Sequence, residues 1–135
     1  MVGVELAVAV VVHPVLLRLP VGAALDGRAH EARMLGRTMP VWYVASLLLT
    51  AALTIATWGT SAAVTAGIAT ALLVISVVMS ATLLVPINNR TATWTADDHP
   101  PDWRDVYRRW DRLHYVRVTV LVGAFVLVLA AATAV

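Results

Sequence analysis

A chain of 135 residues is long enough for one domain, and its composition excludes a soluble globular protein. Apolar residues make up 60% of the chain and charged residues only 13%, and the mean hydropathy is +0.81. Soluble domains carry roughly 25% charged residues. The stretch from Thr38 to Asn89 contains no Asp, Glu, Lys or Arg, and it is long enough for two bilayer crossings of about 20 residues each. The sequence therefore predicts an integral membrane protein.

The same composition excludes several kinds of chemistry. The chain has no cysteine, so a disulfide scaffold, a thiolate metal site and a cysteine nucleophile are ruled out. A net charge of +2 is too small to indicate a nucleic-acid partner. The first ten residues carry Glu5 and lack the positive start of a signal peptide, so we expect them in the mature fold.

The first predicted span covers residues 2–17 and contains two ionisable residues, Glu5 and His13. Pro14 predicts a kink next to His13, because proline cannot donate the helical hydrogen bond. Ionisable residues inside a membrane bundle are costly, which makes both side chains functional candidates. Glu5 has a simpler explanation, since it lies close enough to the start of the chain to reach water. The span is also short, which leaves open a native start upstream of Met1.

The second and third spans are predicted over residues 40–57 and 62–87. Pro40 suits a first helical turn, and Trp42 and Tyr43 follow it at the depth where aromatic side chains favour lipid headgroups. Residues 58–61 predict a tight reversal. The third span is followed by Asn88, Asn89 and Arg90, with Trp94 one helical turn beyond Arg90. A helix C-cap explains one asparagine and Arg90, but it does not explain the second asparagine or Trp94.

An amphipathic helix is predicted over residues 101–115, leading directly into a fourth span over residues 116–135. Its aromatic face consists of Trp103, Tyr107, Trp110, His114 and Arg117, spaced four and three residues apart. An interfacial anchor on the headgroups is one interpretation, which Trp103 fits. Trp110, His114 and Arg117 approach the membrane, and for these an inward-facing role is favoured.

The fold class that follows is all-α: a single transmembrane four-helix bundle over residues 1–135, with the amphipathic interfacial extension before the fourth helix. Small residues four positions apart on the last two spans permit close helix packing. The connections 18–39 and 88–115 hold four and five Arg, and the hairpin between the middle spans holds none. The positive-inside rule places both Arg-bearing connections in the cytoplasm, and both termini outside. We expect a bacterial inner-membrane protein.

One end of this bundle collects the polar side chains. We expect His13 or His114 to act as a base, with His114 kept neutral by the nearby Arg117. The amide and guanidinium groups of Asn88, Asn89, Arg90 and Arg117 would hold an oxyanion. Trp94 and Trp110, with Trp42 and Tyr43, would form aromatic walls. A weaker interpretation takes Glu5, His13, Asp111 and His114 as metal ligands.

Three runs of sequence resemble the anthrone oxygenase-like family, whose members are small four-helix membrane proteins long catalogued as a domain of unknown function. These runs are VELAVAVVVHPVLLRLP, LVPINNRTATW and DWRDVYRRWDRLHYVRV. The resemblance is most specific at Pro86–Arg90 with Trp94, and at Trp110–His114 with Arg117. It implies oxidation of an anthrone to an anthraquinone by molecular oxygen, without a bound flavin, haem or metal.

The leading hypothesis is therefore a membrane oxygenase that uses molecular oxygen as co-substrate on an anthrone-like or other phenolic aromatic compound. No cofactor is predicted. One alternative is a metal- or haem-binding redox protein of the membrane. Another is a non-catalytic protein that binds a small molecule or serves as a subunit of a complex. The expected partners are the lipid bilayer and a hydrophobic aromatic molecule, and a homo-oligomer is compatible with the sequence.

Overall fold

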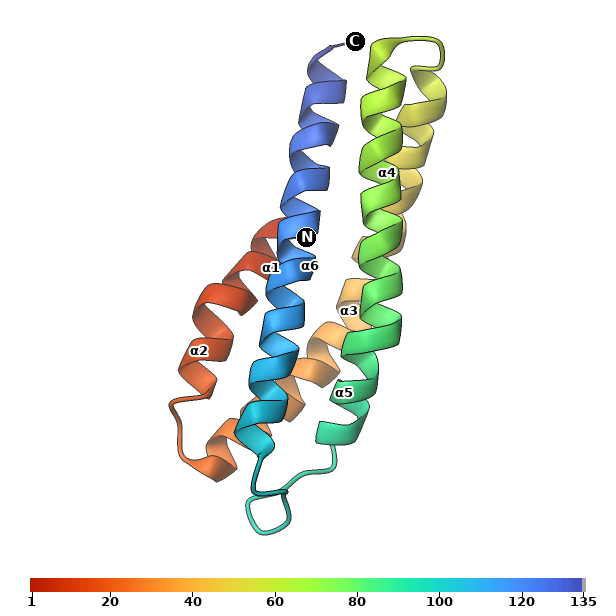
Figure 1. The fold of residues 1–135 in the computed structure, drawn as a ribbon. Helices are drawn as coiled ribbons and strands as arrows, with labels where there is room; N and C mark the ends of the chain where they lie inside the picture. Colours follow the sequence, from red (N-terminus) through yellow and green to blue (C-terminus); the bar gives the residue numbers. More distant parts are fainter. Residues whose placement is uncertain (135) are drawn as a thin grey trace.

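Four helices pack side by side in the computed structural model, which describes residues 1–134 (Figure 1). The first helix consists of α1 (Val2–Ala7), the π-helical turn η1 (Val8–Val12) and α2 (His13–Leu16). The second is α3 (Val21–Ala56). The third consists of α4 (Ser61–Met79), the π-helical turn η2 (Ser80–Leu84) and α5 (Val85–Thr91), and the fourth is α6 (Trp103–Thr133). This arrangement confirms the predicted all-α bundle.

Three of the four helices are long and apolar enough to cross a membrane: Val21–Ala56, Ser61–Thr91 and Trp103–Thr133. The remaining helix, Val2–Leu16, is apolar but shorter. At about 1.5 Å per residue, the long helices extend roughly 46–54 Å, which exceeds the hydrocarbon thickness of about 30 Å. Because the charged residues lie toward one end of these helices, that end extends beyond the hydrocarbon. The chain is a membrane protein.

Each π-helical turn lies just before a proline. η1 ends two residues before Pro14, and η2 ends two residues before Pro86. A proline ring would clash with the carbonyl oxygen four residues earlier in a regular α-helix, and it has no N–H to donate. The wider π turn relieves both problems, so the helix continues where the sequence predicts a kink or an end.

The second helix begins nineteen positions earlier than predicted, at Val21 rather than at Pro40, so most of the expected 18–39 connection is helical. Pro20 precedes its first turn, and Pro40 lies inside it. The charged residues mislead the sequence-based prediction because most of them lie on the outer side: Asp26, Arg33 and Arg37 are exposed, whereas Leu25 and Arg28 are buried. The segment is an amphipathic helix, packed on the rest of the bundle.

The third and fourth helices also differ from prediction at their ends. The third helix continues past Pro86 to Thr91, so Asn88 and Asn89 lie inside α5 rather than at a cap. α6 is continuous through the amphipathic segment and the fourth span, as predicted. The predicted last residue, Val135, lies outside the described residues. Trp103 is only 3% exposed and packs with Leu25 and Tyr107, so it is a core residue and not an interfacial anchor.

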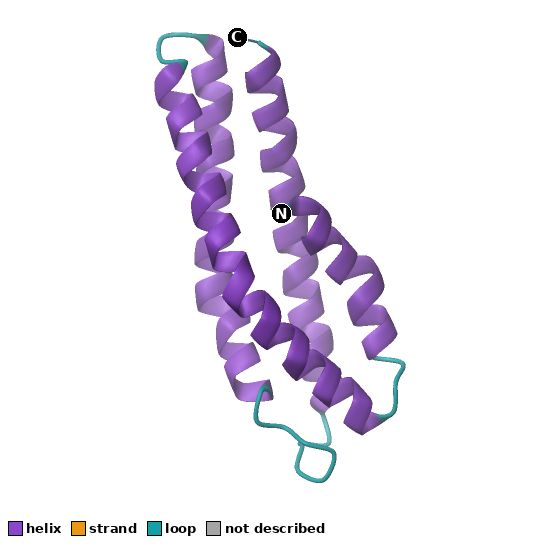
Figure 2. Cartoon of the chain, turned by 180° about the vertical axis from the view of Figure 1, so that it is seen from behind, coloured by secondary structure: helices purple, strands orange, loops and turns teal. Residues whose placement is uncertain are grey.

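The two Arg-bearing connections lie at the same end of the bundle, as the sequence predicts (Figures 1 and 2). The last turns of α6 lie at the opposite end, beside the α3–α4 turn. Met1, however, lies at mid-height along α6. The first helix is about half as long as the others, and the expectation that both termini lie outside the membrane stays a prediction.

The α3–α4 reversal predicted over residues 58–61 depends on Gly59. This residue has a positive φ of 86°, and no neighbouring atom would lie within 4 Å of an added Cβ. Glycine is therefore needed at position 59 only for its backbone conformation, because a side chain at this φ clashes with its own backbone.

We expect Gly59→Ala to lower the free energy of unfolding by about 1–2 kcal/mol. Gly36→Ala should instead raise the free energy of unfolding, because Gly36 lies inside the helix α3 and alanine is the better helix former. An added Cβ at Gly36 also meets no atom within 4 Å. Thermal unfolding of both variants in detergent measures the difference. Equal midpoints would show that the turn tolerates a side chain.

Candidate functional site

A cavity of about 350 Å³ lies between the four helices. Most of its wall is apolar and comes from α3 and from the α4–η2–α5 helix. Its polar lining consists mainly of ionisable groups, contributed by the first helix, α3 and α6. A largely apolar chamber with a few converging polar groups is the usual form of a small-molecule site, for which volumes of about 300–1,000 Å³ are typical.

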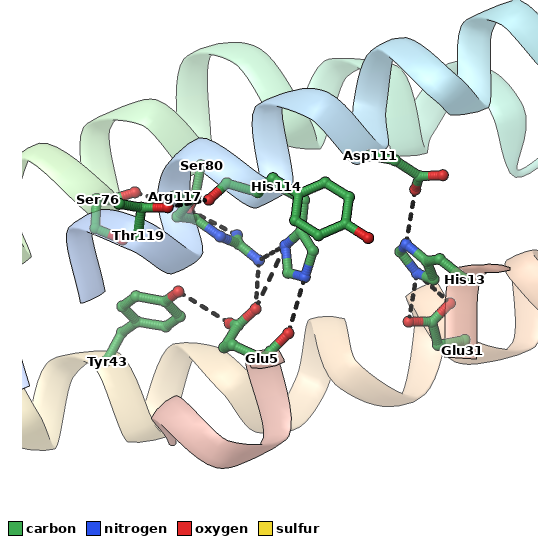
Figure 3. A network of polar contacts seen from close by, with 11 residues as sticks. Glu5, His13, Glu31, Tyr43, Ser76, Ser80, Asp111, His114, Arg117 and Thr119 are labelled. Atoms are coloured by element: carbon green, nitrogen blue, oxygen red, sulfur yellow. Dashed lines mark hydrogen bonds and ion pairs between the residues drawn. The ribbon is translucent and has the colours of Figure 1, made fainter. Parts of the chain in front are cut away.

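The first group of polar side chains, the Glu5 network, consists of Glu5, Tyr43, Ser80, His114 and Arg117 (Figure 3). Glu5 accepts a hydrogen bond from the Tyr43 hydroxyl at 2.9 Å and one from Arg117 Nη2 at 2.7 Å. Arg117 Nη1 donates to Ser80 Oγ at 2.9 Å. Glu5 is only 4% exposed, so it does not reach water as its place in the sequence would allow.

The partners of His114 determine its tautomer. Nε2 lies 3.1 Å from the backbone carbonyl oxygen of Glu5, which can only accept, so Nε2 carries a proton. Nδ1 lies 2.9 Å from Arg117 Nη2, which can only donate, so Nδ1 carries a lone pair. The imidazole is thus neutral, as the sequence predicts. Its lone pair is occupied by Arg117, so His114 has no free acceptor with which to act as a base in this arrangement.

The second group, the His13 network, consists of His13, Arg28, Glu31 and Asp111. His13 Nδ1 lies 2.8 Å from Asp111 Oδ1, and His13 Nε2 lies 2.8 and 2.9 Å from the two oxygens of Glu31. Arg28 Nη2 donates to Asp111 Oδ1 at 2.6 Å. The network joins the first helix to α3 and α6. His13 is 2% exposed, whereas the side chains of Glu31 and Asp111 are each 14% exposed.

The charges of the two networks nearly cancel. Together they contain three carboxylates and two arginines, so one further proton makes them neutral. The His13 network can hold it: each of its two nitrogen–oxygen hydrogen bonds needs a proton, whereas a neutral imidazole brings only one. Buried charges are stable only when they are paired, which favours this balance.

Aromatic rings connect the two networks. The Trp110 ring stacks on His114, with centroids 4.9 Å apart, and lies 4.8 Å from the His13 ring. The two histidine rings are 5.7 Å apart. The Arg28 guanidinium lies over the Tyr107 ring at 4.6 Å from its centroid. Of the aromatic face of α6, the four residues Tyr107, Trp110, His114 and Arg117 line the cavity.

Seven of the candidates from the sequence line this cavity: Glu5, His13, Tyr43, Asn88, Trp110, His114 and Arg117. The asparagine pair separates, because adjacent residues on a helix point in different directions. Asn88 is half-buried and faces the cavity, whereas Asn89 is exposed. Within residues 1–134, neither asparagine side chain hydrogen-bonds to α6.

The remaining candidates lie elsewhere. Trp42 is 52% exposed on the outside of α3, and Arg90 is also exposed. Trp94 does not line the cavity and packs edge-on against Tyr107, with ring centroids 5.8 Å apart. Of the weak metal candidates, Asp111 does not line the cavity and pairs with His13 and Arg28. No three His, Asp or Glu side chains among the described residues form a group suited to a metal ion.

Arg28, Glu31, Ser80 and Tyr107 are lining residues that the sequence analysis did not assign to the site. Arg28 and Glu31 were missed because their segment was expected to be a connection. A signal was present: Leu25, Arg28, Ala32, Leu35 and Met39 follow one another at steps of three and four and continue to Tyr43. That spacing marks one buried face of a helix.

The pairing of Glu5 with Arg117 predicts a strongly non-additive stability effect. Arg117→Gln leaves a buried carboxylate without its cation and should lower the unfolding free energy by about 3–5 kcal/mol. Combining it with Glu5→Gln should recover most of that loss, because no uncompensated charge remains. Thermal unfolding in detergent of the wild type, both single variants and the double variant measures the coupling. Additive losses would contradict the pairing.

Comparison with known proteins identifies the family. The family model described as anthrone oxygenase matches residues 30–127, which include most of α3, the whole of the third helix and most of α6. No curated protein and no solved structure matches the chain. Glu5 and His13 lie outside the matched residues, while Glu31, Asp111, His114 and Arg117 lie within them. Because the match covers more than half of the chain, this protein belongs to the anthrone oxygenase family.

Proposed function

We propose that this protein is a membrane oxygenase that oxidises an anthrone-like aromatic substrate with molecular oxygen. The observation that carries the proposal is the cavity itself: an apolar chamber with an aromatic wall and two ionised networks. Its volume suits a compact polycyclic ring rather than a large cofactor. Family membership supports an oxygenase role, and the cavity supports a flat, oxygenated substrate.

The overall reaction converts a ring CH₂ group and O₂ into a ring carbonyl and water. A base removes one C–H proton, which leaves an enolate whose charge lies on the substrate oxygen. The enolate passes one electron to O₂, and the resulting radicals join to form a carbon–peroxide bond. The peroxide takes up the first proton. Loss of the second C–H proton then breaks the O–O bond, and hydroxide leaves with that proton as water.

We assign the base to the Glu31–His13 pair, with a Glu31 oxygen as the atom that accepts the proton. Glu31 lines the cavity, and each of its oxygens has a lone pair beyond the contact with His13. His13 orients this carboxylate and is itself held by Asp111 from the other ring nitrogen. Molecular oxygen is the co-substrate, and the reaction as written needs no further cofactor.

The developing oxyanion needs donors that are already oriented. The sequence predicts four residues that would hold an oxyanion, and two of them, Asn88 and Arg117, line the cavity. Arg117 is held by Glu5 and Ser80 before any substrate binds, so little reorganisation is required. Trp110 provides the surface on which the substrate ring stacks.

Glu31→Gln should lower the turnover of anthrone by about 10²–10⁴-fold, because it removes the base while keeping the size of the side chain. Asp26→Asn is the matched control: it makes the same chemical change on the exposed side of α3 and should leave turnover unchanged. Oxygen uptake and anthraquinone absorbance, followed together in proteoliposomes, measure the reaction and should agree one to one.

His114→Gln distinguishes this assignment from a base in the Glu5 network. It should reduce turnover less than Glu31→Gln does, because His114 offers no free lone pair. Loss of activity in His114→Gln with activity retained in Glu31→Gln would move the base to the Glu5 network. The absence of oxygen uptake by the wild type with any anthrone would contradict the proposed oxygenase function.

We further propose that the end of the bundle carrying both Arg-rich connections faces the cytoplasm of a bacterial cell. Lys and Arg near the ends of spans favour the cytoplasmic side. The end of α6 lies at the opposite end of the bundle (Figure 1). A reporter that is active only in the cytoplasm should therefore give no signal when fused after Val135, whereas an exported reporter should. The reverse pattern would invert the orientation.

A further inference from the structure

The cavity is open on one side, and the opening lies between two rows of apolar residues. One row lies on α3 and the other on the α4–η2–α5 helix, and within each row the residues are four positions apart. Such spacing places them on one side of a helix. All six line the cavity and are also exposed on the outside of the bundle: Gly36, Pro40, Val44, Val77, Ala81 and Val85. We call this opening the lateral mouth.

The course of α3 explains why the bundle is open there. α3 lies beside α4 near the turn that joins them, and it then crosses toward α2 at the other end (Figures 1 and 2). It diverges from the lower part of the third helix over the turns that carry the lateral mouth. The π-helical turn η2 lies on the opposite edge and presents both Ala81 and Leu84 to the cavity.

The surroundings of the lateral mouth are apolar. Five of its six residues fall within the charge-free stretch from Thr38 to Asn89, and the sixth, Gly36, directly precedes Arg37. Val44 is 56% exposed and Val85 is 46% exposed, as expected for side chains that face lipid. The ionised networks lie deeper, on the first helix, on α6 and on the inner face of α3. The mouth therefore faces hydrocarbon close to the charged end of the bundle.

We propose that the cavity takes its aromatic ligand laterally from the bilayer through this mouth, and that the small residues Gly36 and Ala81 set its width. The proposal rests on the proposed function for the identity of the ligand. It implies a substrate that partitions into lipid, with its oxygenated edge directed inward to the networks. Molecular oxygen, which is also apolar, can follow the same route.

Gly36 offers a way to close the mouth with little disturbance of the fold. An added Cβ at Gly36 would meet no atom within 4 Å, and the residue lies inside a regular helix. Gly36→Trp should therefore fold and fill the mouth, while Gly36→Ala controls for the change in helix propensity. Ala81→Trp narrows the same opening from the opposite edge and serves as an independent second variant.

Access can be measured without any turnover because the chain has no cysteine. Val8→Cys places a single thiol of nearly the same volume in the cavity wall, where the native side chain is 6% exposed. Val10→Cys, in the same η1 segment but at a side chain 52% exposed, is the control on the outside. Proteoliposomes are treated with uncharged methyl methanethiosulfonate or with its charged sulfonatoethyl analogue.

We expect the uncharged reagent to modify Val8→Cys and the charged reagent to modify it at least tenfold more slowly. Adding Gly36→Trp or Ala81→Trp should slow the uncharged reagent at Val8→Cys at least tenfold. Gly36→Ala should slow it far less than Gly36→Trp does, and neither tryptophan should change the rate at Val10→Cys. Equal rates for the two reagents at Val8→Cys would show that the cavity opens to water and would overturn the proposal. Unchanged labelling of Val8→Cys in both tryptophan variants would show that entry occurs elsewhere and would overturn it too.

The same variants separate this proposal from the oxygenase function. With anthrone as substrate, Gly36→Trp should lower kcat/KM at least tenfold while leaving kcat at saturation near that of the wild type. Access controlled at Gly36 in the labelling assay, together with no anthrone oxidation by the wild type, would contradict the proposed function alone. Oxidation that proceeds with unchanged kcat/KM in both tryptophan variants would contradict the lateral route alone.

Discussion

The ion pair between Glu5 and Arg117 connects the shortest helix of the bundle to α6, whose aromatic side chains line the cavity. In lipid there is little hydrophobic force between helices, so packing and polar contacts determine how they associate. The first helix has no long apolar length to contribute. It is held to α6 by Glu5 bound to Arg117, by the Tyr115 hydroxyl bound to the carbonyl oxygen of Ala9, and by His13 bound to Asp111. The position of His13 in the cavity, and therefore that of Glu31, follows from these contacts.

Pro14 and Pro86 lie within helices of the bundle and do not end them. Each is preceded by a π-helical turn, and both turns contribute to the cavity: η1 through Val8, and η2 through Ser80 and Leu84. Such a turn changes the direction in which neighbouring side chains point without ending the helix. Glu5 precedes η1 in the chain and His13 follows it, and both side chains line the cavity. On the facing helix, η2 places Ser80 within reach of Arg117.

The sequence predicts the number of helices, the turn at Gly59 and the aromatic face of α6, because each has a strong local signal. The sequence-based prediction fails where the position of a side chain depends on contacts with residues that are distant in the chain. Arg28 and Glu31 were assigned to a connection because charge usually marks a membrane boundary, and their burial depends on Asp111 and His13, which are distant in the chain. Asn88 and Asn89 were expected to act together, which the helix through Pro86 prevents. The sequence also does not show that Arg117 donates to the lone pair of His114. That contact forms because both side chains are directed at Glu5.

For the proposed reaction, an apolar mouth and a charged interior make opposite demands on the ligand. Entry from hydrocarbon selects a compound with little charge, whereas the networks interact strongly only with a compound that becomes charged inside. A phenolic carbon acid, the substrate class that we propose, would meet both demands, because it is neutral in the bilayer and would become an enolate once its proton passed to Glu31. In the proposed reaction, stabilisation by Asn88 and Arg117 would be greatest for the charge that develops on the substrate. The same order of events would keep the reactive anion out of the bilayer, since it would form only after the ring had left the lipid.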